Sequence, residues 1–360
     1  MKKLKGKIIN HNHSFNGEIN FDKKIVKINK IKNNDFDYYI IPGFVDLHCH
    51  GGYGHDTMEG IPSIDKMSQY HLKNGTTTLL ATTLTASLKD TLTALKGFKS
   101  FIKKNRYITN LIGAHLEGPF INPKKLGAQP SMTQKPNKKF IDKIQKEAEI
   151  KIVTLAPELK GSKKLIDYLI KKKIKVQFGH SLANYDCCFK IMQKHNIGFT
   201  HLYNAMSGTH HREPGVLSAA LHLAKFSEII CDLYHVSKPN ILLAHKCIPY
   251  LYAVSDSISA SGMPDGKYNF ANLKITKKKN QAWIKNDILA GSIVNMHDSF
   301  KNLLKVNLSL ENIVAMTSYN AAKYLNQTKI GKIENGYFSN FLVLDKKFNI
   351  KKVYLYGNLI

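Results

Sequence analysis

Short apolar runs alternate with longer amphipathic stretches through most of the chain, and this alternation constrains the fold more than any other feature. A strand period followed by a helical period, repeated many times, predicts a parallel sheet whose strands are joined by helical crossovers. Eight such runs are the number that closes into a (β/α)8 barrel of the TIM type. The runs are Phe44–His48, Thr77–Ala81, Leu111–His115, Ile150–Leu155, Ile174–Phe178, Ile197–His201, Ile229–Leu233 and Tyr250–Ser255.

A doubly wound open sheet would show the same alternation. It is disfavoured because no G-x-G-x-x-G pattern opens a helix after an early strand, where a dinucleotide would bind. We expect a β-hairpin excursion at Asn269–Asn286, which is polar and alternating. The amphipathic stretches that predict helices are Ser87–Lys103, Asn137–Ala148, Ser162–Lys172, Tyr185–His195 and Asn240–Lys246.

The two ends of the chain share a different texture of short polar and β-branched alternations. It runs through Lys24–Ile28 near the start and through Phe341–Asp345 near the end. Such alternation is typical of antiparallel strands with one face in solvent. We therefore expect the ends, residues 1–41 and 330–360, to form one small β-sandwich domain beside a barrel that spans 42–329.

The charge of the chain is strongly positive, at +27, but its basic residues are almost all lysine. Arg106 and Arg212 are the two arginines among 53 basic residues, whereas proteins that read bases or clamp phosphates favour the planar fork of arginine. We therefore interpret the charge as a solvated lysine coat and expect no nucleic-acid partner. The rarity of arginine makes Arg212 a candidate for a specific contact.

Compartment and membrane signals favour a cytoplasmic chain. No apolar run reaches the length of a membrane span, and the basic N-terminus is not followed by the apolar segment of a signal peptide. The five cysteines form no C-x-x-C pair and do not resemble a disulfide framework. We expect a soluble, cytoplasmic protein in a reducing environment, with no membrane attachment.

The motif P-G-F-V-D-L-H-C-H ends the first barrel strand with two histidines. Side chains at positions i and i+2 of a strand share a face, so His48 and His50 can hold one metal ion together, whereas Cys49 points away. Two glycines follow, Gly51 and Gly52, and we interpret them as clearing space for an approaching ligand.

Polar side chains also follow the later strand-like runs. The carboxyl ends of barrel strands meet at one mouth, so these side chains would converge there with the histidine pair. Imidazole and carboxylate ligands suit Zn²⁺, Fe²⁺, Mn²⁺ or Co²⁺, and a water held by such an ion can attack a carbonyl. Asp256 would then act as the base, and His235 would polarise the carbonyl oxygen. The converging residues are Glu117, His180, His201, His235 and Asp256.

Several longer motifs carry a family resemblance. From Pro42 to about Asp345 the chain contains, in order, P-G-F-V-D-L-H-C-H-G-G, H-L-E-G-P-F-I, G-H-S, T-H-L-Y-N-A-M, H-H-R-E-P-G and S-D-S-I-S-A-S-G-M-P-D-G-K-Y. Together these motifs resemble the amidohydrolase superfamily. H-L-E-G-P-F, and N-A-M followed by H-H-R-E-P-G, are more specific and resemble the N-acetylglucosamine-6-phosphate deacetylases within it.

This resemblance implies hydrolysis of the acetamide of N-acetyl-D-glucosamine 6-phosphate to D-glucosamine 6-phosphate and acetate. It also implies a divalent metal cofactor, one or two ions per subunit, with Zn²⁺ the first candidate and Fe²⁺, Mn²⁺ or Co²⁺ the alternatives. Glu117, His180 and His201 match the principal metal ligands. His48 and His50 match a pair that holds a second ion, with Glu117 bridging.

The resemblance further implies contacts with the substrate. Asp256 matches the catalytic aspartate, and His235 matches the histidine that polarises the substrate carbonyl. Arg212 matches a phosphate contact, and Gln129 stands where some relatives carry a histidine near the phosphate. Many relatives are dimeric, so a homodimer is implied as well. The remaining matches are Asn204 and Ala205 at the sugar, and Ala128, Leu289, Ala290 and Gly291 along the pocket.

Two other functions remain open at this point. Another amidohydrolase could act on a cyclic amide or a nucleobase, but many of those enzymes bridge their metals with a carbamylated lysine on the fourth strand. The run Ile150–Leu155 carries no lysine near its end, and Glu117 offers the bridge instead. A catalytically inactive basic scaffold would show gaps among the ligands or at Asp256, and the sequence has none there.

Overall fold

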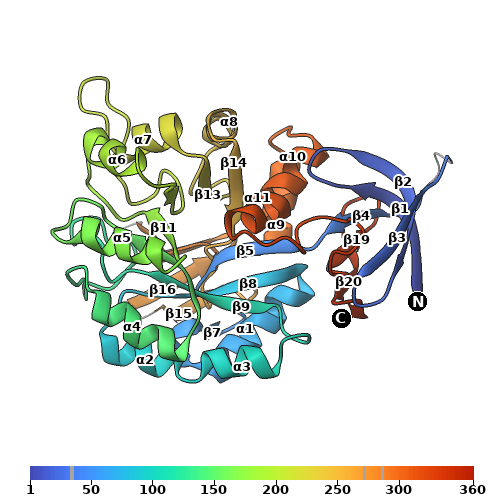
Figure 1. The fold of residues 1–360 in the computed structure, drawn as a ribbon, viewed down its shortest axis with the longest axis horizontal. Helices are drawn as coiled ribbons and strands as arrows, with labels where there is room; N and C mark the ends of the chain where they lie inside the picture. Colours follow the sequence, from blue (N-terminus) through green and yellow to red (C-terminus); the bar gives the residue numbers. More distant parts are fainter. Residues whose placement is uncertain (33–35, 271–272, 285–287) are drawn as a thin grey trace.

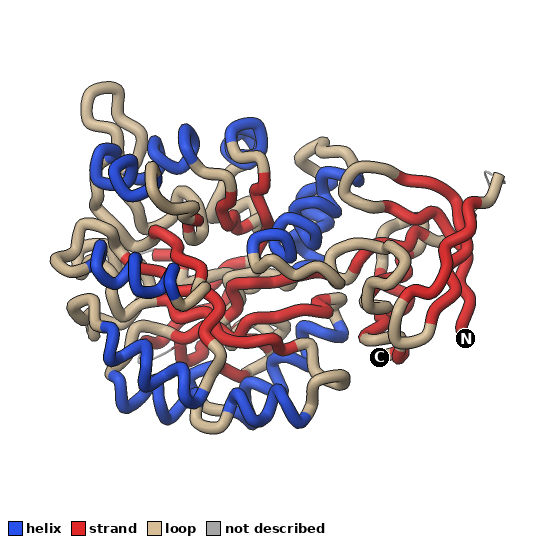
Figure 2. The backbone as a smooth tube through the Cα atoms, viewed as in Figure 1, coloured by secondary structure: helices blue, strands red, loops and turns tan. Residues whose placement is uncertain are grey.

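The computed structural model describes residues 1–32, 36–270, 273–284 and 288–360. Its larger part is a curled parallel sheet with helices packed on its outside, so the predicted α/β class is confirmed (Figure 1, Figure 2). One sheet holds six parallel strands in the order β12, β11, β10, β9, β8 and β5. They are β5 (Phe44–Cys49), β8 (Thr76–Thr83), β9 (Leu111–Glu117), β10 (Ile150–Leu155), β11 (Lys175–Phe178) and β12 (Gly198–Phe199).

A second, two-stranded parallel sheet continues the curl. Backbone hydrogen bonds just beyond the strands join it to the first sheet at both sides. At one side Leu202 N donates to the oxygen of Glu228, at 3.0 Å. At the other side Asp256 N donates to the oxygen of His48, at 2.8 Å, and His50 N donates to the oxygen of Ser257, at 2.9 Å. Both joints therefore lie beside predicted site residues. The two strands are β13 (Phe226–Ile230) and β14 (Tyr250–Val254).

The prediction for the seventh barrel strand is wrong in its position. The apolar run suggested Ile229–Leu233, whereas the strand is Phe226–Ile230. The chain leaves the sheet after this strand, and Leu233 has a left-handed backbone with φ of 68°. The strand therefore includes Glu228, a charged residue that a search for apolar runs excludes.

Helices cover the outer face of the curled sheet (Figure 1). The predicted helix Ser87–Lys103 is instead two helices, α2 and α3, because Gly97 between them has a left-handed φ of 73°. Ser87 begins the first of them by accepting a hydrogen bond from Asp90 N. The helices are α1 (Ile61–Lys73), α2 (Leu88–Leu95), α3 (Phe98–Lys104), α4 (Lys138–Glu147), α5 (Ser162–Lys171), α6 (Tyr185–Met192), α7 (Val216–Leu223), α8 (Lys238–Cys247), α9 (Met296–Leu304), α10 (Leu310–Val314) and α11 (Asn320–Tyr324).

Strands from both ends of the chain form a seven-stranded sheet at one end of the molecule, close to both termini (Figure 1). Strand β4 joins the two ends, because it pairs parallel with β1 and antiparallel with β19. The predicted pairing of the ends is therefore confirmed, while the sandwich form stays a prediction. In sheet order the strands are β21 (Asn358–Leu359), β20 (Ile350–Leu355), β19 (Phe341–Leu344), β4 (Tyr39–Pro42), β1 (Lys2–Ile9), β2 (Ser14–Phe21) and β3 (Ile25–Lys30).

An antiparallel four-stranded sheet follows β14 in the chain. It contains the excursion predicted at Asn269–Asn286 and is longer than predicted; residues 271–272 and 285–286 of that stretch lie outside the described residues. One face is apolar, because Phe270, Ile275 and Ala282 pack into a buried cluster with Ile258. The strands are β15 (Gly266–Phe270), β16 (Leu273–Lys278), β17 (Gln281–Ile284) and β18 (Ile288–Leu289).

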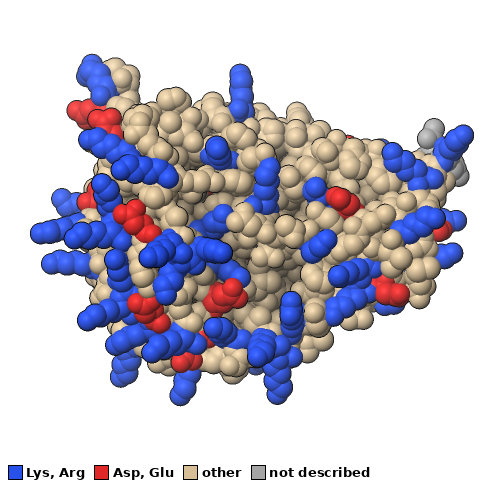
Figure 3. All heavy atoms as spheres, viewed as in Figure 1, with Lys and Arg blue, Asp and Glu red and all other residues tan. Residues whose placement is uncertain are grey.

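Lysine and arginine side chains are spread over most of the face that Figure 3 shows, with acidic side chains scattered among them. The spread matches a solvated coat rather than one concentrated basic stripe. Among the described helices, none combines the length and the apolar character that crossing a bilayer requires.

Candidate active site

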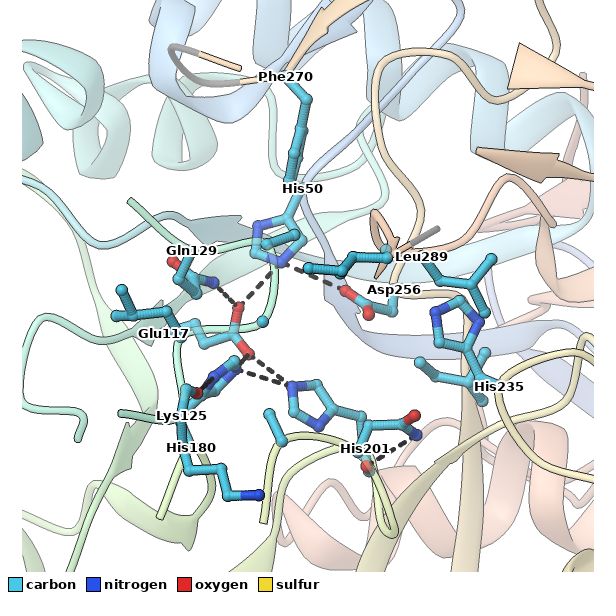
Figure 4. Close-up of a pocket in the computed structure, with 18 of the residues that line it drawn as sticks. His50, Glu117, Lys125, Gln129, His180, His201, His235, Asp256, Phe270 and Leu289 are labelled. Atoms are coloured by element: carbon cyan, nitrogen blue, oxygen red, sulfur yellow. Dashed lines mark hydrogen bonds and ion pairs between the residues drawn. The ribbon is translucent and has the colours of Figure 1, made fainter. Parts of the chain in front are cut away.

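A cavity of about 630 Å³ opens at the carboxyl ends of the parallel strands (Figure 4). Its polar side chains lie at the end of β9 or after β5, β9, β11, β12, β13 and β14, which is where a curled parallel sheet presents functional residues. His48 is fully buried beside His50 and completes the group. The predicted residues that line the cavity are His50, Glu117, Ala128, His180, His201, Asn204, Ala205, His235, Asp256, Leu289 and Gly291.

One cluster of possible metal ligands joins Glu117, His180 and His201. Glu117 Oε1 lies 3.1 Å from His180 Nε2 and 3.0 Å from His201 Nε2, and the two nitrogens are 3.0 Å apart. His180 Nδ1 donates to the backbone oxygen of Lys125, at 2.8 Å, so its Nε2 is free to act as a ligand. His201 Nδ1 is buried without a hydrogen-bond partner. A cation between these atoms fits their spacing and chemistry.

A second cluster surrounds the other oxygen of Glu117. His48 Nε2 and His50 Nε2 lie 3.2 Å apart, and Glu117 Oε2 is 3.4 Å from the first and 3.0 Å from the second. Asp256 Oδ1 is 3.3 Å from each of these nitrogens. Glu117 therefore faces both histidine pairs through separate oxygens, as a bridging carboxylate must.

Hydrogen bonds at Nδ1 orient the imidazoles of His48 and His50, as is usual for metal-binding histidines. His48 Nδ1 lies 2.9 Å from the carboxylate oxygen Oε2 of Glu228, and His50 Nδ1 lies 3.2 Å from the backbone oxygen of Thr82. Each Nδ1 can donate its proton to that oxygen. Both Nε2 atoms then offer lone pairs to the same small volume, a donor set of nitrogen and oxygen that suits a divalent metal.

Burial and nearby charges oppose each other in this cluster. Burial lowers the pKa of His48, but the carboxylates of Glu117 and Glu228 outweigh it and raise that pKa well above its usual range. Burial also lowers the pKa of His50, yet hydrogen bonds to Asp256 and Glu117 raise it to about 9. Burial raises the pKa of Glu117, while the neighbouring imidazoles, His48 first, hold it well below its usual range. The cluster therefore requires positive charge among its carboxylates, from protons or from a cation.

Three site residues adopt left-handed backbones, and each is the second residue after the end of its strand. The φ angles are 49° at His180, 26° at His201 and 47° at Asp256. Such a conformation costs a residue with a side chain about 1–3 kcal/mol and persists where the surroundings enforce it. At each of these positions the sharp turn follows the strand end and presents the side chain to the cavity.

Asp256 and His235 stand together on the wall opposite His180 (Figure 4). Burial raises the pKa of Asp256, but His48 and the hydrogen bond with His50 lower it below its usual value, so the carboxylate is ionised. His235 Nδ1 lies 2.6 Å from the carboxylate oxygen Oδ2 of Asp232, to which it donates. Its Nε2 remains available to the cavity.

Glu228 is a functional residue that the sequence prediction missed. It is fully buried, it holds His48, and its other oxygen accepts a hydrogen bond from Gln177 Nε2 at 3.0 Å. Its signal in the sequence is a lone acidic residue inside the run F-S-E-I-I. Asp232 was missed as well, although an aspartate three residues before His235 is a recognisable partner.

The structure changes the interpretation of Gln129. Its side-chain amide donates to Glu117 Oε2, and its oxygen accepts from Thr85 N at 2.7 Å. The side chain is thus committed to holding the bridging carboxylate rather than a phosphate. Ala290 is also displaced from its predicted role, since its side chain is fully buried in the cluster beneath β15–β18.

Arg212 lies apart from the main cavity. It lines a neighbouring cavity with Asn184, Ser207 and Glu213, on an exposed loop. His210 shapes this loop, as its Nδ1 accepts from the backbone N of Glu213 at 3.1 Å. In the main cavity the lysines among the lining residues are Lys124 and Lys125.

The structure confirms the prediction for Cys49 and corrects the prediction for Gly51 and Gly52. Cys49 points away from the metal clusters as predicted, with its Sγ 3.2 Å from His71 Nε2. The two glycines do not clear space for a ligand. A Cβ at Gly51 would lie 2.4 Å from the oxygen of His55, and one at Gly52 would lie 2.8 Å from His71 Nε2. These glycines are therefore needed for close packing of the chain itself.

Residues 39–360 match the model of the amidohydrolase family. The chain belongs to this family, whose members depend on metal ions. The two clusters around Glu117 are thus the groups of this chain that fit the family's cofactor.

Individual relatives show to which group of amidohydrolases the chain belongs. The chain is 38% identical over 300 residues to a Bacillus subtilis N-acetylglucosamine-6-phosphate deacetylase, covering 80% of this chain and 76% of that protein. It is similar to the structure of the Thermotoga maritima N-acetylglucosamine-6-phosphate deacetylase, with a TM-score of 0.93 and 30% identity over 99% of both chains. It is also similar to a mutant of the Mycobacterium smegmatis deacetylase in complex with N-acetyl-D-glucosamine-6-phosphate, with a TM-score of 0.91 and 25% identity, covering 99% of this chain and 98% of that one. Within the amidohydrolases, the chain is a member of the N-acetylglucosamine-6-phosphate deacetylases.

Proposed function

We propose that this protein hydrolyses the acetamide of N-acetyl-D-glucosamine 6-phosphate and releases D-glucosamine 6-phosphate and acetate. One observation carries the proposal: Glu117 faces two pairs of histidines through separate oxygens, with Asp256 beside them in a single cavity. Membership of the deacetylase family supplies the substrate. A cyclic amide or a nucleobase as substrate has no comparable support.

The metal ligands follow from the same geometry. We propose that Glu117, His180 and His201 hold one ion and that His48 and His50 hold a second, with Glu117 between them. Zn²⁺ is the first candidate, and Fe²⁺, Mn²⁺ and Co²⁺ suit the same ligands. A divalent ion bound there would polarise a carbonyl and acidify a water molecule.

Asp256 is proposed as the general base and acid. Its ionised carboxylate can take a proton from the attacking water and deliver it to the amine nitrogen as the amide bond breaks. His235 is proposed to act as an imidazolium, which donates a hydrogen bond from Nε2 to the acetamide oxygen while its second proton, on Nδ1, is held by the carboxylate of Asp232. This pair would stabilise the negative charge that develops on that oxygen.

The substrate contacts are proposals as well. Asn204 and Ala205 face the cavity and would contact the sugar, while Ala128, Leu289 and Gly291 would line the pocket. Arg212 is proposed as the phosphate contact, in a homodimer. Because Arg212 lines a neighbouring cavity, this contact requires a shift of its loop or a second copy of the chain.

We further propose that the eight parallel strands act as one closed barrel within residues 42–329. The backbone hydrogen bonds at both joints between the two parallel sheets support this reading. Residues 1–41 and 330–360 are proposed to form a small β-sandwich domain beside it, supported by the pairing of β4 with β19.

Acetate release by the purified, metal-loaded protein tests the function. We expect release from N-acetylglucosamine 6-phosphate, much less from the unphosphorylated sugar, and loss of release with a chelator. Equal rates with both sugars would reject the phosphate contact alone. No release with Zn²⁺, Fe²⁺, Mn²⁺ or Co²⁺ would reject the function.

The variant Asp256→Asn tests the catalytic assignment within that assay. General acid–base catalysis is worth about 10²–10⁴-fold, so we expect kcat to fall by that factor while the substrate still binds. Asp265→Asn is the matched control, since Asp265 is an exposed turn residue that accepts from Lys279 N. Its kcat should equal that of the wild type.

A further inference from the structure

We propose that Trp283 is a substrate-binding residue whose indole packs on the pyranose ring of the acetamido sugar phosphate. This inference rests on the proposed function and extends it to the part of the substrate that does not react. It concerns the wall of the cavity that faces the metal clusters.

That wall comes from the antiparallel sheet β15–β18. We call the four apolar residues that it contributes to the cavity the hood: Phe270, Trp283, Ile288 and Leu289. Phe270 stands over His50, with the two ring centres 6.0 Å apart, and Leu289 points into the cavity between His50 and Asp256 (Figure 4). The hood thus covers the same space that the metal ligands surround.

Trp283 lines the cavity from the face of β17 that lies opposite Ala282. Its neighbour Ala282 is 1% exposed and packs into the buried cluster of the small sheet. Successive side chains of a strand point to opposite faces, so Trp283 faces away from that cluster. It pairs directly across the ladder with Leu289, which shares its face and also lines the cavity.

The hood is incompletely buried. Trp283 is partly exposed, and Ile288 is 48% exposed at the rim, whereas Phe270 is 2% exposed. The indole is therefore not a core residue of the small sheet, whose apolar cluster is formed by other side chains. A partly exposed aromatic surface opposite a polar wall suits a ligand with one polar and one apolar side.

A pyranose ring has those two sides. Its hydroxyl and acetamido groups can reach the polar residues, and the C–H bonds of one ring face form an apolar patch. Packing such a patch against an indole removes apolar area of both partners from water. Because the ring does not change during amide hydrolysis, the contact would stabilise the bound substrate and the transition state alike. It should therefore appear in KM rather than in kcat.

Fluorescence tests the contact directly, since Trp283 is the single tryptophan of the chain. Zn²⁺-loaded Asp256→Asn protein is titrated with N-acetylglucosamine 6-phosphate, which it should bind without turning it over. We expect a saturable change in tryptophan emission with a midpoint near the wild-type KM. The proposal would be overturned if the wild type hydrolyses the sugar phosphate but the emission spectrum of the variant stays unchanged at saturating ligand.

Kinetics supply the second readout. We expect Trp283→Ala to raise KM about tenfold with kcat within about threefold, and Trp283→Phe to recover most of the loss. Gln281→Ala, two residues earlier on the same strand face, should behave as the wild type. An unchanged KM, or a fall in kcat alone, would overturn the proposal. No acetate release from metal-loaded wild type would instead reject the proposed function, and this inference with it.

Discussion

Replacing Glu228 by glutamine tests whether the buried carboxylate behind His48 sets the strength of the second metal site. Glu228 is fully buried, and its Oε2 lies 2.9 Å from His48 Nδ1. The variant has the same shape but no charge. A hydrogen bond to a charged group is worth about 1.5–3 kcal/mol, which corresponds to about 10–100-fold in affinity.

The same range is typical of residues that orient a metal-bound histidine. We therefore expect Glu228→Gln to weaken the ion held by His48 and His50 by about 10–100-fold. The ion held by Glu117, His180 and His201 should change far less. Glu228 contacts His201 through the backbone N, at 3.3 Å, whereas the His180 and His201 rings contact Lys125 and Glu117.

The assay is metal content per chain after equilibration across a series of metal buffers. Wild type should show two classes of site, and the variant should lose the weaker class at metal levels that fill it in the wild type. Glu149→Gln makes the same change at an exposed residue paired with Lys151 and serves as the control. Identical binding curves for wild type and Glu228→Gln, or a single class of site in the wild type, would refute the reasoning.

Three further predictions concern the metal, the backbone and a buried histidine. Dialysis against a chelator should abolish acetate release and lower the thermal midpoint, and Zn²⁺ should restore both; a chelated protein with full activity would contradict the assignment. Gly291→Ala should lower both kcat and stability, because Gly291 has a φ of 54° and a Cβ there would lie 2.7 Å from Ile258 Cγ2; Gly208→Ala, where a Cβ meets nothing within 4 Å, should change neither. Burial lowers the pKa of His71 to about 4. Below pH 6.5, the usual pKa of histidine, His71 therefore binds a proton in the unfolded chain but not in the folded chain. His71 should consequently contribute about 2 kcal/mol to the fall in stability between pH 7.5 and pH 5, and His71→Gln should lack that contribution, measured by urea unfolding; equal pH dependence in both proteins would contradict the role of His71.

The sequence predicted the order of strands well, because apolar runs and helical stretches differ in period. It failed where a different rule decided the local structure. The chain breaks the stretch Ser87–Lys103 at Gly97, and a helical period carries no signal for a left-handed glycine. The prediction from the sequence misplaced β13 because Glu228 interrupts the apolar pattern. In the structure the buried charge of Glu228 is paired with His48.

For the site, residues at strand ends were predictable because parallel strands present their carboxyl ends together. The four proposed histidine ligands all gather around the fifth, Glu117. Partners from distant elements were not predictable. Gln129 comes from a loop, and nothing in its neighbours announces a hydrogen bond to Glu117. Trp283 belongs to an inserted sheet whose position over the cavity depends on how that whole sheet packs.

The strand β4 has a consequence for how the molecule is made. Its partner β1 is synthesised just before it, but its other partner, β19, begins at Phe341. At about 5–20 residues per second, the ribosome needs roughly 15–60 s to cover the intervening stretch of about 300 residues. Throughout that time one edge of Tyr39–Pro42, with its apolar Ile40 and Ile41, has no strand beside it. An open apolar strand edge can pair with other chains. Pairing of β19, one of the last strands to leave the ribosome, with β4 therefore ends the period in which the nascent chain can aggregate through this edge.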